Sequence, residues 1–380
     1  ILGGGFSGVW AAMAAASQRH NHGATDIEII LISNSEDLCI RPRLYEAIHQ
    51  SMLVPLLPLM KEINVKLIID NVEFITAENS VVCKNQTVDY DKLIFALGSK
   101  LKQPDIKGSK ENVFNIDTYE ASLAFNHRIK QLIAKRKNKV QIHIIGSGFT
   151  GIELITKLHQ RFKDKVALTL IERSDSIARG LGTSVHSEIM LALAHANVDI
   201  LLAHQVELFE HNRIQFTNGQ SLHADVLVLS TGLIANPLTQ DISENLDSSN
   251  RVMVNQTLQL PENCHVFVAG DSAKAKVDDE HYSLMSCQHA MPMGTVAGVN
   301  AINLLLELPL LPYRQEFYVT CLDLGGSGAV FTQGWERELV KKGHSGAEIK
   351  AQINNQWIYP PSPTIGKTEI FNFIQSKLND

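Results

Sequence analysis

Two glycine-rich turns, roughly 140 residues apart, constrain the fold of this chain more than any other feature. They read GGGFSG over residues 3–8 and GSGFTG over residues 146–151. Each turn follows the end of an apolar strand pattern and precedes an apolar helical pattern, which is the context that a GxGxxG motif requires. The sequence therefore predicts two separate Rossmann-type βαβ units, each built on a parallel sheet.

The elements around both turns follow from the hydrophobic pattern. The first turn leads into an Ala-rich helix over about Val9 to His20 and then a strand over Ile27 to Ile32. Strands over Val140 to Ile145 and Val166 to Ile171 flank the second turn and its helix, which runs to about Phe162. This alternation of strand and helix is typical of doubly wound α/β folds.

The expected fold class is α/β, with the second Rossmann-like unit inserted in the first. Ala121 to Lys137 is typical of a linker helix, and Ala224 to Gly232 is the expected last strand of the inserted unit. His265 to Asp271 is the expected strand that returns to the first unit, and from about Leu310 the sequence becomes rich in aromatic residues, Gly and Pro. We predict a first unit over residues 1–120 and 261–309, an inserted unit over 121–260, and a C-terminal element over 310–380.

Composition excludes several classes of function. The 380 residues carry a formal net charge of -6, with a pI near 6.2, so no basic surface for nucleic acid is expected. The densest basic run, residues 135–139, is more typical of a solvated helix end. Five cysteines lie far apart without a CxxC pair, which fits a reducing cytosol, and no metal site is expected. Neither a membrane span nor a signal sequence is expected, so the protein should be cytoplasmic.

The glycine turns suggest binding of two dinucleotides. A GxGxxG turn lets the backbone approach a pyrophosphate, and the helix that follows presents free N–H groups to it. A tight turn that only packs a helix on a strand is the alternative for either copy alone. The residues expected to bind are Gly3, Gly5, Phe6, Ser7 and Gly8 in the first turn, and Gly146, Gly148, Thr150 and Gly151 in the second.

The end of the second strand in each unit selects the nucleotide. Glu172 ends this strand in the inserted unit, where a carboxylate can accept hydrogen bonds from adenosine ribose hydroxyls. Its charge would repel a 2'-phosphate, so NADH is expected over NADPH, although Arg173 could pair with that phosphate. In the first unit Asn34 occupies the corresponding place and is the candidate ribose contact, without the usual carboxylate.

The chain resembles the flavoproteins with two dinucleotide-binding domains, the pyridine nucleotide-disulfide oxidoreductase superfamily, and in particular type II NADH dehydrogenases. The resemblance rests on both turns and on the segments at residues 96–98 (ALG), 230–232 (STG), 236–237 (NP) and 269–271 (AGD). It implies an FAD-binding first domain, an inserted NADH-binding domain, and the same domain order. Residues 41–46 (RPRLYE) resemble the family's stretch beside the flavin, although Arg41 departs from its pattern. The expected cofactor contacts are Arg41, Pro42, Ala96, Gly98, Gly232, Gly270, Asp271, Gln288 and His289.

Two residues are predicted to act in catalysis. Gln288 lies in a segment, residues 286–290 (SCQHA), that opens an apolar helix. The N-terminus of this helix could stabilise negative charge on a reduced flavin, whereas a helix cap without a ligand is the alternative for Gln288 and His289. Glu153 matches a glutamate that lies near the nicotinamide and the quinone entrance in the dehydrogenases that the chain resembles. On physical grounds alone it is a first-turn carboxylate that complements the helix dipole.

Three functions are compatible with these residues. The first is an FAD-dependent NADH dehydrogenase that passes electrons to a quinone or another small acceptor. The second is a sulfide:quinone-type enzyme, because Cys321 resembles a cysteine of that class, although a partner between Gly98 and Gly151 is missing and a buried structural thiol is favoured. The third is a redox-sensing flavoprotein with little turnover. Dithiol substrates are not expected, because no cysteine pair lies on the helix that would face the flavin.

The C-terminal tail carries an amphipathic pattern. Its apolar positions are three or four residues apart and Lys377 is almost its only cation, so docking on the protein itself is favoured over a membrane anchor. We expect at most weak peripheral contact with the cytosolic face of a membrane, and a quinone groove lined partly by Leu304 to Leu311. A homodimer is compatible with the resemblance. The apolar tail positions are Ile370, Phe371, Ile374 and Leu378.

Overall fold

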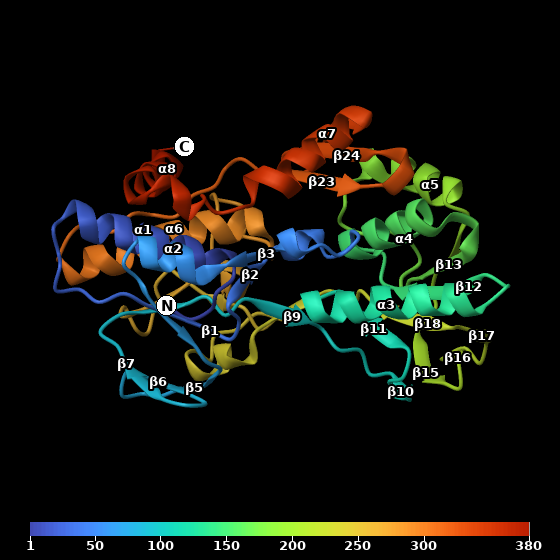
Figure 1. The fold of residues 1–380 in the computed structure, drawn as a ribbon, viewed down its shortest axis with the longest axis horizontal. Coiled ribbons are helices and arrows are strands. Elements are labelled where there is room, and N and C mark those ends of the chain that lie inside the picture. Colours follow the sequence, from blue (N-terminus) through green and yellow to red (C-terminus); the bar gives the residue numbers. More distant parts are fainter. Residues whose placement is uncertain (380) are drawn as a thin grey trace.

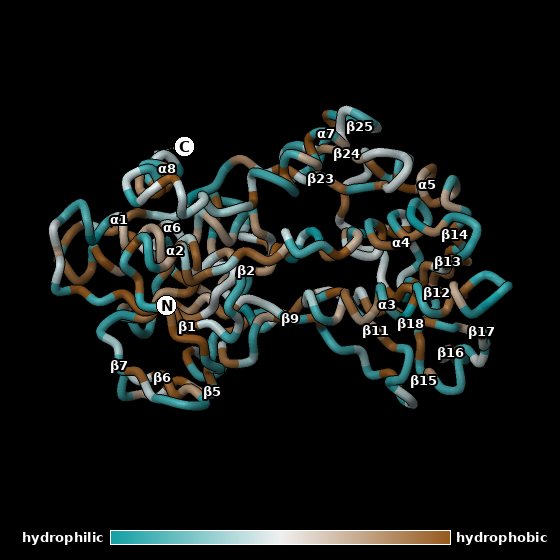
Figure 2. The backbone as a smooth tube through the Cα atoms, in the orientation of Figure 1, coloured by the Kyte–Doolittle hydropathy of each residue, from teal (hydrophilic) through white to brown (hydrophobic). Residues whose placement is uncertain are grey.

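A computed structural model describes residues 1–379 of the chain. Two α/β units lie side by side, and a C-terminal element extends over both of them (Figure 1). Apolar residues follow the strands and the inward faces of the helices in each unit, whereas the outer loops are largely hydrophilic (Figure 2). The expected α/β class is confirmed.

The first unit is built on a small parallel sheet. β1 (Ile30–Ser33) pairs with β4 (Lys66–Ile69), β8 (Leu93–Phe95) pairs with β21 (Val266–Val268), and Leu2 bridges β1 to β8. The long helices α1 (Phe6–Asn21) and α6 (Cys287–Leu305) pack against each other beside this sheet. Their backbones come close because α6 contributes Gly294 and Gly298, where a Cβ would lie 2.2 and 2.3 Å from carbonyl oxygens of α1. The remaining elements of this unit are β2 (Asp37–Cys39), β3 (Leu53–Pro55), α2 (Leu56–Glu62), β5 (Val72–Ile75), β6 (Ser80–Cys83), β7 (Thr87–Asp89), β20 (Val252–Met253) and β22 (Ala273–Lys274).

The inserted unit has a five-stranded parallel sheet in the order β11-β18-β12-β13-β14. The strands β12 (Val140–Ile145) and β13 (Val166–Ile171) have the predicted bounds, because their buried β-branched runs leave little choice. By contrast, α1 begins at Phe6 rather than Val9, and β1 begins at Ile30 rather than Ile27. The other elements are β11 (Val113–Asn115), β18 (Val226–Leu229), β14 (Val198–Leu201), α3 (Tyr119–Lys135), α4 (Phe149–Phe162), α5 (His186–His195), β10 (Lys107–Gly108), β15 (Val206–Glu210), β16 (Arg213–Phe216) and β17 (Ser221–His223).

The two segments that connect the units pair with each other. β9 (Ser99–Leu101) runs antiparallel to β19 (Leu233–Ala235), so the chain leaves and returns side by side. The sheets divide the chain at other places than residues 120 and 260. β11 already belongs to the inserted sheet, and β20 pairs with β22 of the first unit.

The C-terminal element begins with the antiparallel sheet β23 (Val319–Asp323), β24 (Ala329–Gln333) and β25 (Glu338–Gly343). Helix α7 (His344–Gln352) and a π-helical turn (Ile353–Trp357) then lead back to the first unit. The final helix α8 (Lys367–Asn379) packs on α1, with Ile370 and Ile374 fully buried. This confirms that the apolar face of the tail docks on the protein itself. None of the helices in residues 1–379 has both the length and the hydropathy needed to cross a membrane.

Candidate functional site

A cavity of about 800 Å³ lies between the first and the inserted unit. Both glycine turns reach it, together with the starts of α1, α4 and α6. The structure therefore brings together most of the residues that the sequence singled out. Those in the cavity wall are Gly5, Phe6, Ser7, Arg41, Pro42, Ala96, Gly98, Gly146, Gly148, Thr150, Glu153, Glu172, Gly232, Gly270 and Asp271.

The two glycine turns have the same local geometry. Gly3 and Gly146 both adopt φ +106°, where a Cβ would lie 2.3 and 2.2 Å from a carbonyl oxygen. Gly8 and Gly151 are equally crowded, since a Cβ there would come within 2.0 Å of the first glycine's oxygen. At Gly5 and Gly148, however, nothing lies within 4 Å of a Cβ. The outer glycines therefore serve close packing, and the middle glycines keep the backbone open to the cavity.

Both turns lead into helices whose first N–H groups are free. Gly5 and Gly148 are the N-caps of α1 and α4, neither helix has a side-chain cap, and neither has an acidic residue in its first turn. The two N-cap glycines are exposed at the cavity, so these N–H groups are open to a ligand. An anion such as a pyrophosphate is the kind of ligand that a helix start of this type binds.

The two ribose candidates lie in different surroundings. Glu172 follows β13 and lines the cavity with Arg173. Burial alone would raise the pKa of Glu172, but hydrogen bonds from Ser174 and Ser147 outweigh it and lower that pKa. Asn34 is exposed beyond the end of β1 and is not part of the cavity wall. Asn34 directly follows β1 as Glu172 directly follows β13, but it lies outside the cavity wall, so its ribose contact stays a prediction.

Asp271 has a hydrogen-bonded support that the sequence did not reveal. Ser99 Oγ donates to Asp271 Oδ2 over 2.6 Å, and the Arg41 guanidinium donates to the same hydroxyl oxygen over 3.3 Å. Arg41 in turn forms an ion pair with Asp117, just before α3. Burial raises the pKa of Asp271, with the Ser99 hydrogen bond opposing it. Within the described residues, Oδ1 of Asp271 accepts no hydrogen bond and is available to a ligand hydroxyl.

The start of α6 lines the cavity, but Gln288 and His289 do not. Gln288 Oε1 accepts a hydrogen bond from the backbone of Val319 over 3.4 Å. The His289 ring, 1% exposed, stacks on Tyr318 at 5.8 Å between centroids. Neither side chain lines the cavity in this structure, so their contact with the flavin stays a prediction. They point toward the C-terminal element because Cys287 and Ala290 occupy the cavity face of the helix.

The burial of His289 leads to a prediction about pH. Desolvation lowers the pKa of His289 from 6.5 to about 4, although a hydrogen bond with Gln315 opposes the shift. Between these values the unfolded chain binds a proton that the native protein excludes, so stability is lost as the pH falls. The loss from pH 7 to pH 5 should be about 2 kcal/mol. Urea unfolding at both pH values tests this, and a His289→Gln variant with an equally steep loss would contradict it.

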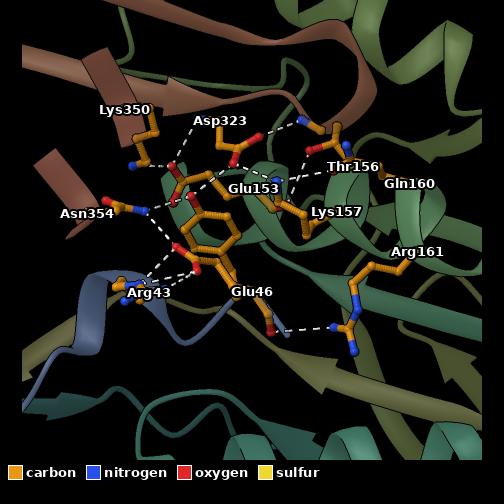
Figure 3. Close-up of polar contacts among 12 residues, drawn as sticks. Arg43, Glu46, Glu153, Thr156, Lys157, Gln160, Arg161, Asp323, Lys350 and Asn354 are labelled. Atoms are coloured by element: carbon orange, nitrogen blue, oxygen red, sulfur yellow. Dashed lines mark hydrogen bonds and ion pairs between the residues drawn. The ribbon is translucent and has the colours of Figure 1, made fainter. Parts of the chain in front are cut away.

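Glu153 lies beyond the first turn of α4 and its side chain is buried. It is the fifth residue of α4, its side chain is 8% exposed, and Lys350 of α7 lies 2.7 Å from its Oε1 (Figure 3). The backbone N–H of Asp323 donates to the same oxygen over 3.0 Å. The interpretation as a simple dipole partner is therefore wrong. Burial raises the pKa of Glu153, with Lys350 opposing the shift, and Glu153 raises the pKa of Lys350 against its own burial.

A second layer of polar contacts surrounds this ion pair. Tyr45 lines the cavity and donates to Asp323 Oδ2 over 3.0 Å, while Lys157 lies 2.8 Å from the same oxygen. Burial raises the pKa of Tyr45. Asn354, in the π-helical turn, donates to Glu46 over 2.8 Å, and Figure 3 shows these side chains converging between α4 and the C-terminal element. A π-helical turn is often found at functional sites.

The cysteines give no sign of a sulfur relay. All five are free, and Cys321 Sγ lies 3.8 Å from the carbonyl oxygen of Gly346. Burial raises the pKa of Cys321 to about 12, so it stays a thiol, as expected of a structural residue. The described residues also contain no cluster of three or more His, Cys, Asp or Glu that could hold a metal.

The predicted quinone groove along Leu304 to Leu311 does not coincide with this cavity. Only the start of α6 lines the cavity, and the helix extends over 19 residues, about 28 Å, before Leu305 ends it. Leu304 and Leu305 pack against buried core clusters of the first unit instead.

A family model described as pyridine nucleotide-disulphide oxidoreductase matches residues 1–294. The chain belongs to this family. The expected oxidoreductase class is thereby confirmed, and FAD and NADH are the cofactors used in it. The domain order that the resemblance implied agrees with the two α/β units described above.

The chain is also similar to individual proteins of known name. An NADH dehydrogenase-like protein of Mycobacterium tuberculosis is 33% identical over 375 residues, covering 95% of this chain and 94% of the relative. A demethylphylloquinone reductase of Synechocystis is 25% identical, covering 87% of this chain and 85% of the relative. Among solved structures, the sulfide:quinone oxidoreductase of Aquifex aeolicus covers 98% of this chain and 90% of its own, with a TM-score of 0.77 and 21% identity. This last likeness concerns the fold alone.

Proposed function

We propose that this protein is an FAD-dependent NADH dehydrogenase that passes electrons from NADH, through the flavin, to a quinone-like acceptor. The observation that carries the proposal is that both glycine turns open into one cavity. FAD held by the first turn and NADH held by the second would then meet between the units. Relatives named as NADH dehydrogenase-like proteins and quinone reductases support this assignment.

The residues present fit both nucleotides. The free helix starts of α1 and α4 suit two pyrophosphates, and Asp271 has an open oxygen for the ribityl hydroxyls of FAD. When bound, FAD supplies the hydride chemistry, and the protein supplies alignment and electrostatics. The N-terminus of α6 lies in the cavity wall and has no side-chain cap. The positive end of its helix dipole therefore favours a negative charge beside it.

The part of the cavity wall formed by α4 contains the residue that we assign to proton transfer to the acceptor. Reduction of a quinone consumes protons as well as electrons, so a site for it needs a group that can carry a proton. Glu153 lines the cavity with a raised pKa, and Lys350 holds its carboxyl in place. We assign the Glu153 carboxylate, ion-paired with Lys350, to this step as the group that accepts a proton and passes it on. Gln288 enters as a positioning residue, because its side chain faces away from the cavity.

Neither alternative function gains support from a specific observation. A sulfide:quinone-type enzyme needs a reactive thiol, whereas the raised pKa of Cys321 keeps it protonated. We further expect the protein to make a weak peripheral contact with a membrane surface, where a quinone would be found. We also expect it to form a homodimer.

Anaerobic stopped-flow absorbance tests the function directly. NADH should bleach the flavin absorbance of the holoprotein faster than NADPH, and a short-chain quinone added afterwards should restore it. Sulfide should leave the absorbance unchanged. Bleaching by sulfide but not by NADH would overturn the proposal, as would a reduced flavin that no quinone reoxidises.

A further inference from the structure

The carboxylate expected to bind the NADH ribose is already fully hydrogen-bonded. Ser147 donates to Glu172 Oε2 from its backbone N–H over 3.1 Å and from its hydroxyl over 2.7 Å. Ser174 donates to Oε1 in the same two ways, over 3.0 and 2.9 Å. A carboxylate offers about four acceptor positions, so these four donors occupy them all. A ribose hydroxyl can reach Glu172 only if one serine donor leaves.

The two serine hydroxyls differ in how easily they can leave. Ser174 Oγ lies 2.9 Å from Glu172 Oε1 and also 2.9 Å from the carbonyl oxygen of Ser176. A hydroxyl carries one hydrogen, so it can donate to only one of these acceptors at a time. Turning to Ser176 would free a position on Oε1 without leaving the Ser174 hydroxyl unpaired.

Ser147 has no such second acceptor among the described residues. Its hydroxyl oxygen accepts the backbone N–H of Ala178 over 3.1 Å, which orients the remaining hydrogen toward Glu172 Oε2. The Ser147 side chain is 3% exposed and Ala178 is buried, so displacing this hydroxyl would leave buried polar groups unpaired. Glu172 Oε2 therefore keeps both Ser147 donors and is not available to a ribose hydroxyl.

We propose that Ser174 is an exchangeable positioning residue of the NADH site, which yields its place on Glu172 Oε1 to one adenosine ribose hydroxyl. Glu172 then binds one of the two ribose hydroxyls and not both. The inference rests on the proposed function, since it assumes that NADH occupies the inserted unit. It goes beyond that function by naming the residue that controls ribose recognition and the number of hydroxyls recognised.

Calorimetry with ADP-ribose, which cannot reduce the flavin, tests this on the holoprotein. Two analogues, lacking either the 2'- or the 3'-hydroxyl of the adenosine ribose, should behave differently from each other. One should bind about tenfold more weakly than ADP-ribose, and the other should match it. Equal losses with both analogues, or no loss with either, would overturn the proposal without the use of any variant.

Ser174→Ala gives a second test, in which the direction of the change in ADP-ribose affinity decides the outcome. It should bind ADP-ribose about fivefold more tightly, because the ribose no longer displaces a hydroxyl from a charged acceptor to a neutral one. The analogue that lacks the recognised hydroxyl should bind the variant and the natural protein equally, and Ser174→Thr, which keeps the hydroxyl, should behave like the natural protein. Weaker or unchanged ADP-ribose binding to Ser174→Ala would contradict the exchange. If ADP-ribose does not bind the natural protein at all, the proposed NADH site itself fails.

Discussion

Replacing Lys350 with methionine is expected to destabilise the protein by about 3–5 kcal/mol. The Lys350 and Glu153 side chains are 12% and 8% exposed, so the remaining carboxylate would stay buried without a counter-charge. Only the backbone N–H of Asp323 would still bond to it among the described residues. Urea unfolding, followed by circular dichroism at neutral pH, measures the difference between the variant and the natural protein.

Two controls separate loss of the ion pair from loss of packing. In the double variant Glu153→Gln with Lys350→Met, most of the lost stability should return, because no buried charge remains unpaired. Lys342, in β25 of the same C-terminal element, pairs with Glu188 of α5 but is 60% exposed, and Lys342→Met removes this pair. It should cost less than about 1 kcal/mol. If the double variant is as unstable as Lys350→Met alone, the ion pair is not the cause.

Local patterns made the central strands and the glycine turns predictable. β12 and β13 are mostly buried apolar runs, each preceded by a lysine and followed by Gly146 or Glu172, so their ends can be read directly from the sequence. The presence of a helix after each glycine turn was also predictable, although α1 begins at Phe6, three residues before the predicted Val9. The start of β1 was less well defined: the apolar pattern begins at Ile27, but pairing with β4 begins only at Ile30.

Long-range partners were not predictable in the same way. Lys350 lies 197 residues from Glu153 in the sequence, and neither a motif nor a charge pattern marks it. Ser99 and Asp117 likewise gained a role only once Arg41 and Asp271 were placed beside them. Hydrophobic periodicity fixes which residues are buried, but it does not say which buried polar groups meet.

The orientation of side chains on a predicted helix was a further limit. The helix that starts near residue 286 was expected, and its N-terminus does reach the cavity. A one-residue difference then decides which side chains face the cavity. Cys287 and Ala290 line it, while Gln288 and His289 face the C-terminal element, whose position could not be inferred from composition.

Asp271→Ala is expected to weaken FAD binding by about 10- to 150-fold, because hydrogen bonds to a charged group contribute about 1.5–3 kcal/mol. Asp271 follows β21 in the cavity wall, with Ser99 holding one carboxylate oxygen and the other open. Titration of FAD into the apoprotein, followed by the quenching of flavin fluorescence, gives the dissociation constant. Absorbance after gel filtration gives the fraction of flavin retained.

Ser99→Ala is the matched control, because it keeps the carboxylate and removes only the hydroxyl that orients it. Its loss of FAD affinity should be smaller than that of Asp271→Ala, since the carboxylate with its open oxygen remains in the cavity wall. Removing the donor should also raise the pKa of Asp271 further, because the Ser99 hydrogen bond opposes the effect of burial. FAD binding by Ser99→Ala should therefore decline at a higher pH than in the natural protein as the solution is acidified. Full flavin retention by Asp271→Ala would contradict the assignment, and equal losses in both variants would mean that Ser99 contacts the cofactor directly.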